Sequence, residues 1–399
     1  MNRDDFSIFR NSSVVYFDNG ATTLKPDIVR NEINNYYNNY TSNIHRGDYK
    51  NSLKVSELYE ECREKVRRFI NAKHCSEIVF TSGTTDSLND IILGYFKYKL
   101  KSGDEVIISE AEHASNVLPW FVLEKELGII VKYVFLDDNN EVTIDNLKKA
   151  ITSKTKVVSL AHITNVIGDI RDIKSISKLC HENNILLVVD AAQSIAHIPT
   201  DVQDMDIDFM AFSAHKMYGP SGVGVLYGKF NLLQEMVPRN YGGDMNAVFT
   251  RDGYMELKDL PSRLEAGTPN IEGVLGLNAC IDYINNIGID KIYKYEHDLR
   301  DYLVSRLKEL DFIKIYNENN CSTTVVFNIE GVFSQDTAIY LDKYNICVRA
   351  GNHCAKILKD VFNIANTCRI SLSFYNTKNE IDLLINVLKN SKNIWEEIL

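Results

Sequence analysis

A lysine that follows an apolar run is the first group in this sequence that could do chemistry. Lys216 ends the segment Ser213-Ala-His-Lys216, directly after the apolar run 209–212 and before a glycine-rich turn. A lysine at the end of a buried strand loses solvation, which favours its neutral amine and allows a Schiff base with a carbonyl compound. The alternative is a surface lysine in a turn, because most lysines are exposed.

A carboxylate and an anion site could work with this lysine. Asp190 ends the apolar run 185–189, and burial there requires a partner such as a protonated ring nitrogen, which would make the ring a better electron sink. The alternative for Asp190 is a helix N-cap. Gly83-Thr84-Thr85 lies between a predicted strand and a predicted helix, where free N–H groups and hydroxyls bind phosphate. Ordinary threonine capping is the alternative for this segment.

Histidine, arginine and cysteine side chains complete the candidates. His113 could stack on a planar ring and move protons, because the pKa of histidine lies near neutrality, or it could be structural. Arg349 and Arg369 flank Cys354 and could bind a carboxylate with two hydrogen bonds, or they could be structural or surface residues. The spacing of the His, Cys, Asp and Glu residues does not indicate a metal site, so we predict none.

Alternating strands and helices must position these groups. From residue 77 onward, short β-branched runs alternate with helical patterns, which predicts a mainly parallel sheet covered on both faces. Ligands of such α/β sheets bind at the carboxyl ends of the strands, and polar residues follow five of the predicted strands. We expect a large α/β domain over residues 16–268 and a smaller α+β domain over 269–399 together with 1–15. The predicted strands of the large domain are 77–81, 105–109, 131–135, 156–160, 185–189 and 209–212.

The composition excludes several classes of partner. The 399 residues include 54 acidic and 44 basic side chains, so we expect no binding to nucleic acid or to an anionic membrane. The longest apolar run is far shorter than the roughly 20 residues that span a bilayer. Eight scattered cysteines without a Cys-x-x-Cys pair, and a charged start in place of a signal peptide, predict a cytoplasmic protein.

These motifs resemble the class V aminotransferase group of pyridoxal 5′-phosphate (PLP) enzymes and, within it, the group II cysteine desulfurases of the SufS type. The resemblance runs over nearly the whole chain. Its most specific segments are Ser213-Ala-His-Lys216 and the later Arg349-Ala-Gly-Asn-His-Cys354. Further matching segments are Tyr16-Phe-Asp-Asn-Gly-Ala-Thr-Thr23, Asn43-Ile-His-Arg-Gly47, Glu265-Ala-Gly-Thr-Pro-Asn270 and Cys368-Arg-Ile-Ser371.

The resemblance implies a PLP-dependent fold of type I and a role for each site residue. Lys216 would hold PLP, Asp190 would pair with the pyridinium nitrogen, and His113 would stack on the ring and act in catalysis. Cys354 would be the nucleophile that accepts the sulfur. The implied contacts to PLP and substrate are Asn165 and Gln193 near the ring hydroxyl; Thr84, Thr85, Ser213 and His215 at the phosphate; Thr268 at the phosphate of a neighbouring subunit; and Arg369, Arg349 and Asn165 at the substrate.

The implied reaction converts L-cysteine to L-alanine and leaves the sulfur as a persulfide on Cys354. A homodimer is implied by Thr268, and a sulfur-acceptor protein of the SufU or SufE kind would receive the sulfur for iron–sulfur cluster assembly. The alternatives are a selenocysteine lyase or a cysteine-sulfinate desulfinase and, from another class, an inactive sulfur carrier that keeps Cys354. His353, Arg349 or the bound substrate could activate Cys354, and the sequence leaves this choice open.

Three positions depart from the family pattern. The loop before the cysteine often has two histidines, where this chain has Asn352 and His353. A second histidine in the early loop is replaced by Tyr49, and the first of two alanines near the N-terminus is replaced by Gly20. The changes at Asn352 and Gly20 could alter the reactivity of the cysteine or the fit of the substrate. The change at Tyr49 bears on substrate choice.

Overall fold

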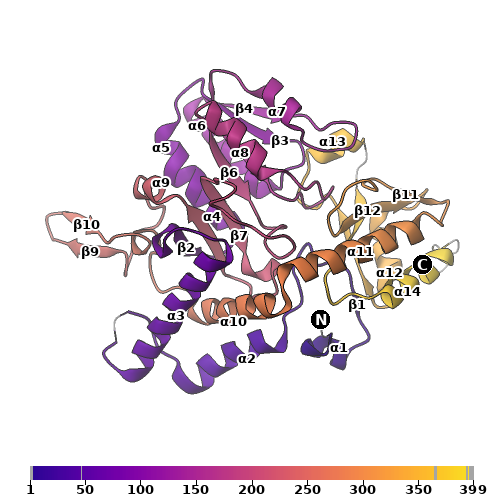
Figure 1. Cartoon of the computed structure of the whole chain (residues 1–399), viewed down its shortest axis with the longest axis horizontal. Coiled ribbons are helices and arrows are strands. Elements are labelled where there is room, and N and C mark those ends of the chain that lie inside the picture. Colours follow the sequence, from indigo (N-terminus) through magenta and orange to yellow (C-terminus); the bar gives the residue numbers. More distant parts are fainter. Residues whose placement is uncertain (1–2, 46, 364–365, 392–393, 395–399) are drawn as a thin grey trace.

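A seven-stranded sheet forms the centre of the larger part of the molecule (Figure 1). The computed structural model describes residues 3–45, 47–363, 366–391 and 394, so Arg46 of the early loop lies outside the described residues. The strand order is β2-β8-β7-β6-β5-β3-β4. The strands are β2 (Ile78–Thr81), β3 (Glu105–Ser109), β4 (Ile130–Val134), β5 (Thr155–Ala161), β6 (Leu186–Asp190), β7 (Phe209–Ser213) and β8 (Gly224–Gly228).

Strand direction brings the predicted chemical groups to one edge of this sheet. The strands from β7 to β4 are parallel to one another, which confirms the predicted sheet. Strand β8 is antiparallel to both of its neighbours, so β2 runs in the same direction as β7. The carboxyl ends of β2, β3, β5, β6 and β7 therefore lie at the same edge.

The sheet is buried on both faces, as its nearly continuous apolar strands predict. Leu187 and Val189 of β6 belong to one hydrophobic cluster, and Val188 between them belongs to the cluster on the opposite face. The helices and short helical segments of this part are α2 (Asp27–Asn35), α3 (Lys50–Phe69), α4 (Thr84–Ile91), α5 (Lys97–Lys99), α6 (Leu118–Leu127), α7 (Ile144–Ala150), α8 (Ile173–Glu182) and α9 (Phe230–Gln234).

A four-stranded antiparallel sheet, in the order β11-β12-β15-β14, forms the centre of the smaller part. Its core includes Leu299, Phe327 and Ile385. The elements are α11 (Ile289–Leu307), β11 (Ile313–Ile315), β12 (Thr324–Ile329), α12 (Ser334–Asp342), β13 (Ile346–Cys347), β14 (Arg349–Gly351), α13 (Leu358–Phe362), β15 (Thr367–Ser371) and α14 (Lys378–Lys389).

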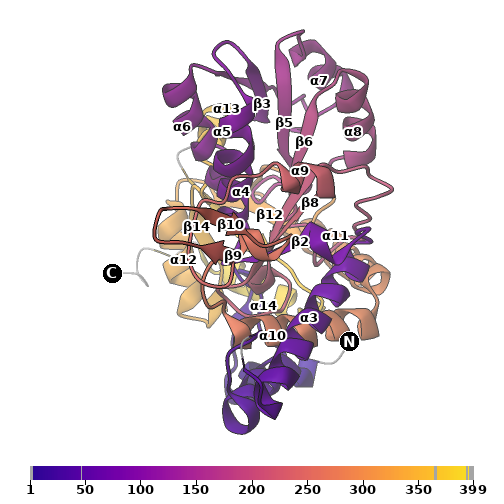
Figure 2. The ribbon, with the colours of Figure 1, turned by 90° about the vertical axis from the view of Figure 1, so that its left-hand side faces the viewer.

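Two segments of the chain bear on how the two parts connect. Helix α10 (Ile271–Ile287) packs against α2 and α3 and joins the core of the large sheet (Figures 1 and 2). The N-terminal residues, after α1 (Ser7–Asn11), form β1 (Val15–Tyr16), which pairs in parallel with β13 of the smaller part. The domain boundary between residues 268 and 269 stays a prediction.

An antiparallel hairpin of β9 (Asn246–Phe249) and β10 (Met255–Leu257) projects from the body of the molecule (Figure 1). Its apolar side chains Phe249 and Met255 are exposed. Within the described part of the chain, no helix is both long and apolar enough to cross a bilayer.

Candidate active site

The edge where the strands end holds a cavity of about 270 Å³. It collects the predicted site residues from the large sheet and from the smaller part, with the exception of Thr268. The lining residues are Gly20, Ala21, Thr84, Thr85, His113, Ser115, Ala161, Ile163, Asn165, Asp190, Gln193, Ser213, His215, Lys216, Arg349, His353, Cys354 and Arg369.

Lys216 lies at the end of the short 3₁₀ turn Ala214–Lys216, which follows β7 directly. Burial lowers the pKa of Lys216 to about 8, although the charge of Asp190 acts in the opposite direction. Its Nζ makes no hydrogen bond or ion pair with the residues that the structure describes. A partly desolvated amine that is free of partners is suited to forming a Schiff base.

Asp190 ends β6 and is buried, with a side chain that lines the same cavity as Lys216. Burial raises the pKa of Asp190 to about 6, while the N–H of Ala192, which donates to Oδ1 at 2.9 Å, and the charge of Lys216 lower it. Oδ2 has no recorded partner among the described residues. A cationic N–H group in the cavity would complete the hydrogen bonds of this carboxylate and favour its charged form.

The segment after β2 forms a polar cradle with the end of β7. Ser213 Oγ lies 2.7 Å from the backbone N–H of Thr84 and 2.7 Å from Thr84 Oγ1. Gly224 of β8 passes so close that a Cβ at this position would lie 2.4 Å from Gly83 Cα, so only glycine fits there. This cradle at the start of α4 opens to a cavity of about 280 Å³ that His215 also lines. Backbone N–H groups and hydroxyls in this arrangement suit a phosphate.

Two histidines of the cavity are uncharged near neutral pH. Burial, with the charges of Lys216 and Arg369, lowers the pKa of His113 to about 4. Burial, with the charges of Lys216 and Lys25, likewise lowers the pKa of His215 to about 4. The Ser115 N–H donates to His113 Nδ1 at 3.1 Å, so the proton of this neutral ring is on Nε2.

Asn165 and Gln193 line the cavity through side chains that other segments orient. Gln193 Nε2 donates to the carbonyl oxygen of Gly20 at 2.8 Å, and Asn165 Nδ2 donates to that of His353 at 2.6 Å. Asn165 Oδ1 is buried without a hydrogen-bond partner among the described residues. It is therefore available to a ligand that carries a hydroxyl or N–H group.

Arg369 and Arg349 enter the cavity from the smaller part, and both are held by Asp18. The guanidinium of Arg369 is buried and donates to Asp18 Oδ1 at 3.1 Å and to the Asn165 carbonyl oxygen at 2.9 Å. Arg369 Nε is buried and has no partner among the described residues. Arg349 Nε donates to both oxygens of Asp18, and its side chain is 45% exposed. Asp18 is a residue that the sequence prediction did not name, although it lies within the matching segment 16–23.

Cys354 is an exposed free thiol at the mouth of the cavity. It lies within electrostatic range of Lys216, Arg349 and Arg369. Burial, with the charge of Arg369, lowers the pKa of His353 to about 3, so this neighbour is neutral at physiological pH. The cationic side chains that interact with Cys354 are therefore the two arginines and the lysine.

A buried network of ion pairs supports residues that line the cavity. Arg171 Nη1 donates to Glu112 Oε1, and Arg171 Nε donates to Asp169 Oδ2 at 3.0 Å. Glu112 Oε2 accepts from the N–H of Ala161, which lines the cavity, and the neighbouring His113 lines it too. The sequence carries no sign of the pairing between Glu112 and Arg171, because an ion pair across 59 positions has no local pattern.

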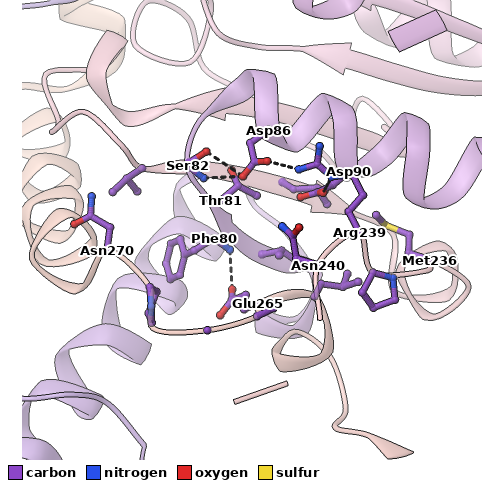
Figure 3. A pocket seen from close by; sticks show the side chains of 18 of the residues that line it. Phe80, Thr81, Ser82, Asp86, Asp90, Met236, Arg239, Asn240, Glu265 and Asn270 are labelled. Carbon is purple, nitrogen blue, oxygen red and sulfur yellow. Dashed lines mark hydrogen bonds and ion pairs between the residues drawn. The ribbon is translucent and has the colours of Figure 1, made fainter. Parts of the chain in front are cut away.

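Thr268 lies outside the cavity of its own chain. It is exposed, and Asn43 Nδ2 lies 3.5 Å from its Oγ1. Its neighbours Gly267 and Pro269 line a separate cavity of about 220 Å³ (Figure 3). This second cavity also contains Ser82, Arg239 and Glu265, with Arg239 paired to Asp86 and Asp90. Among the described residues no group of three or more His, Cys, Asp or Glu side chains could hold a metal ion.

The chain matches the family model for aminotransferase class V over residues 15–384. The chain belongs to this family. A probable cysteine desulfurase of Halalkalibacterium halodurans is 41% identical over 388 residues, which cover 97% of this chain and 95% of that protein. The family membership confirms the predicted resemblance to class V aminotransferases, and this relative confirms the predicted enzyme class, a cysteine desulfurase.

Solved structures of two cysteine desulfurases have the same fold. The cysteine desulfurase of Thermococcus onnurineus superposes with a TM-score of 0.93 at 36% identity, covering 97% of this chain and 96% of that one. The cysteine desulfurase CsdA of Escherichia coli superposes with a TM-score of 0.92 at 34% identity, covering 98% of each chain. These likenesses confirm the predicted fold class.

Proposed function

We propose that this chain is a PLP-dependent cysteine desulfurase of group II, which converts L-cysteine to L-alanine and takes the sulfur onto Cys354. One observation carries the proposal: a lysine suited to a Schiff base and an exposed thiol line the same cavity of about 270 Å³. A buried guanidinium with a free Nε, that of Arg369, lines it as well. The cavity therefore holds an amine to carry the cofactor, a thiol to accept the substrate sulfur and a guanidinium to bind the substrate carboxylate.

The residues of the cavity fit PLP. Lys216 would hold the aldehyde carbon, Asp190 would accept from the ring nitrogen, and Asn165 Oδ1 would meet the ring hydroxyl with its unused acceptor. The cradle of Thr84, Thr85, Ser213 and His215 would hold the phosphate, with Gln193 and His113 beside the ring. PLP supplies an electron sink for the negative charge that develops at Cα of the substrate.

Proton and sulfur transfer then fall to side chains of this chain. Lys216, whose pKa near 8 makes it a base that is partly neutral at physiological pH, takes the proton from Cα. Arg369 holds the substrate carboxylate, and its own orientation is fixed by Asp18. The Cys354 thiolate attacks the substrate sulfur, so that an S–S bond forms while the C–S bond breaks. The carbon skeleton then gains one proton at Cβ and one at Cα, which balance the proton released by the Cys354 thiol and the proton taken by Lys216, and leaves as L-alanine.

Turnover of three substrates tests this function. Purified protein loaded with PLP should form L-alanine from L-cysteine, and mass spectrometry should find one added sulfur on the peptide that contains Cys354. Selenocysteine and cysteine sulfinate serve as matched substrates, because faster turnover of either would assign the chain to the alternative reactions. Failure to form alanine from all three, with persulfide still accepted from a donor, would identify a sulfur carrier.

Replacement of Arg369 by alanine should raise the KM for L-cysteine about 10- to 100-fold, because a charged hydrogen bond contributes about 1.5–3 kcal/mol. Arg349→Ala is the matched control, and we expect a smaller increase because Arg349 is half exposed and already bound to Asp18. Steady-state kinetics with the absorbance spectrum of bound PLP measure both effects. An unchanged KM with an altered cofactor spectrum would instead give Arg369 a structural role.

A homodimer and a separate acceptor protein belong to the same proposal. Thr268 is exposed, and its neighbours Gly267 and Pro269 line the cavity of Figure 3. Ser82, two residues before Thr84 of the phosphate cradle, lines the same cavity. A second copy docked over this face would bring its Thr268 toward the neighbouring cradle. We assign delivery of the sulfur to an acceptor of the SufU or SufE kind for iron–sulfur cluster assembly. The eight free thiols support a reducing, cytoplasmic setting.

A further inference from the structure

The loop that carries Cys354 adopts a backbone conformation that its residues disfavour. His353 and Cys354 are consecutive, and both have positive φ angles, of 51° and 59°. Residues other than glycine rarely adopt this left-handed region, because Cβ approaches the backbone too closely. Asparagine, aspartate and histidine are found there more often than the others, but as single residues rather than in succession. Such a pair persists only where the surrounding structure holds it in place.

The large-domain side holds the backbone of this pair. Asn165 Nδ2 donates to the His353 carbonyl oxygen at 2.6 Å, and the Ala114 N–H donates to the Cys354 carbonyl oxygen at 2.8 Å. Asn165 and Ala114 follow β5 and β3, so both contacts come from the cofactor side of the cavity. They fix the position of the backbone but leave the other side of the loop to be held by the His353 ring.

The His353 ring is anchored on β15. Its Nε2 lies 3.1 Å from the Thr367 carbonyl oxygen and 2.9 Å from Thr367 Oγ1. A carbonyl oxygen only accepts hydrogen bonds, so the neutral ring carries its proton on Nε2. His353 and Thr367 are both buried, and His353 Nδ1 has no partner among the described residues. The hydrogen bonds recorded for this ring within the described chain are therefore those to Thr367.

We propose that Thr367 is a positioning residue for sulfur capture, which holds the His353 ring and thereby keeps Cys354 at the mouth of the cavity. Arg369 lies two residues further along the same strand. Strand β15 thus positions two groups. It carries the guanidinium that holds the substrate carboxylate, and through His353 it positions the thiol that attacks the substrate sulfur. The proposal rests on the proposed function, in which Cys354 is the sulfur acceptor.

Thr367→Val tests the proposal, because valine keeps the shape and removes Oγ1. Persulfide formation on Cys354 in a single turnover should slow about fivefold, the effect of one lost hydrogen bond, while affinities for PLP and L-cysteine stay unchanged. Amide hydrogen exchange of residues 351–355 should also increase about fivefold in the cofactor-free protein. Thr367→Ser should restore both rates. Thr324→Val in β12 is the matched control, since Thr324 is buried and its hydroxyl has no recorded partner in the described chain.

Three results would overturn the proposal: wild-type rates in Thr367→Val, a Thr367→Ser variant as slow as the valine variant, or weaker binding of PLP and L-cysteine in parallel with the slower capture. The last of these would indicate a general packing role. Failure of the proposed function looks different, because wild-type protein would then form no persulfide from L-cysteine. The exchange of residues 351–355 in the cofactor-free protein would in that case decide the proposal by itself.

Discussion

Lys216→Ala is expected to yield protein without covalently held cofactor and with alanine formation lowered by a factor of about 10³ or more. The amine performs two tasks in the proposed reaction, holding PLP and accepting the Cα proton, and general base catalysis alone contributes about 10²–10⁴-fold. Borohydride reduction followed by peptide mass spectrometry should find the pyridoxyl group on Lys216 in the unaltered protein. Turnover of L-cysteine measures the loss.

Two controls test whether the effect depends on the Lys216 amine itself, rather than on its positive charge or on a neighbouring lysine. Lys216→Arg keeps a positive charge but cannot form a Schiff base, so we expect it to be as inactive as the alanine variant. Lys25 is a second lysine near the site, and its Nζ donates to the carbonyl oxygen of His215 at 2.8 Å. A pyridoxyl group on Lys25, or on any lysine in Lys216→Ala, would refute the assignment of Lys216.

Cys354→Ala should bind PLP and L-cysteine normally, yet form alanine at least about 100-fold more slowly, because the substrate sulfur has no acceptor. Mass spectrometry of the unaltered protein after L-cysteine, without reductant, should find the extra sulfur on the Cys354 peptide. Cys321→Ala is the matched control, because Cys321 is the other exposed cysteine. Sulfur on Cys321, or near-normal turnover in Cys354→Ala, would move the nucleophile elsewhere.

The four buried cysteines do not compete as nucleophiles, for a physical reason. Burial raises the pKa of the thiols of Cys62, Cys180, Cys280 and Cys368, so they stay protonated and unreactive at physiological pH. They fill the hydrophobic cores as small apolar side chains. Cys75 and Cys347 are half-buried, and Cys354 is the exposed cysteine that lines the cavity.

A site residue could be predicted from the sequence where a local pattern, such as an apolar strand before it, determines where the residue lies in the fold. Asp190 and Lys216 each follow an apolar strand, and the carboxyl ends of parallel strands share one edge, so their meeting followed from the pattern. Strand β8 was not predicted, because its start at Gly224 continues a glycine-rich turn. That glycine is required by the close passage of Gly83, a contact that no periodicity reports.

Contacts between distant segments lay beyond sequence reasoning. Asp18 holds Arg369, which is 351 positions away, and neither residue carries a mark of the other in the sequence. The neutral state of His353 depends on burial and on the charge of Arg369, which exist only in the folded protein. Three candidates for the activation of Cys354 were therefore compatible with the sequence, and burial in the folded protein rules out a cationic His353.

The pairing of β1 with β13 has a consequence for how the chain is made. Val15 and Tyr16 leave the ribosome first, and their partners Ile346 and Cys347 follow about 330 residues later. At roughly 5–20 residues per second, the N-terminal strand waits about 15–70 s for its neighbour. Phe17 is fully buried in the folded protein, but during that interval it lacks the residues that bury it. The nascent chain therefore presents an unpaired apolar segment to chaperones until residues 346 and 347 have been synthesised.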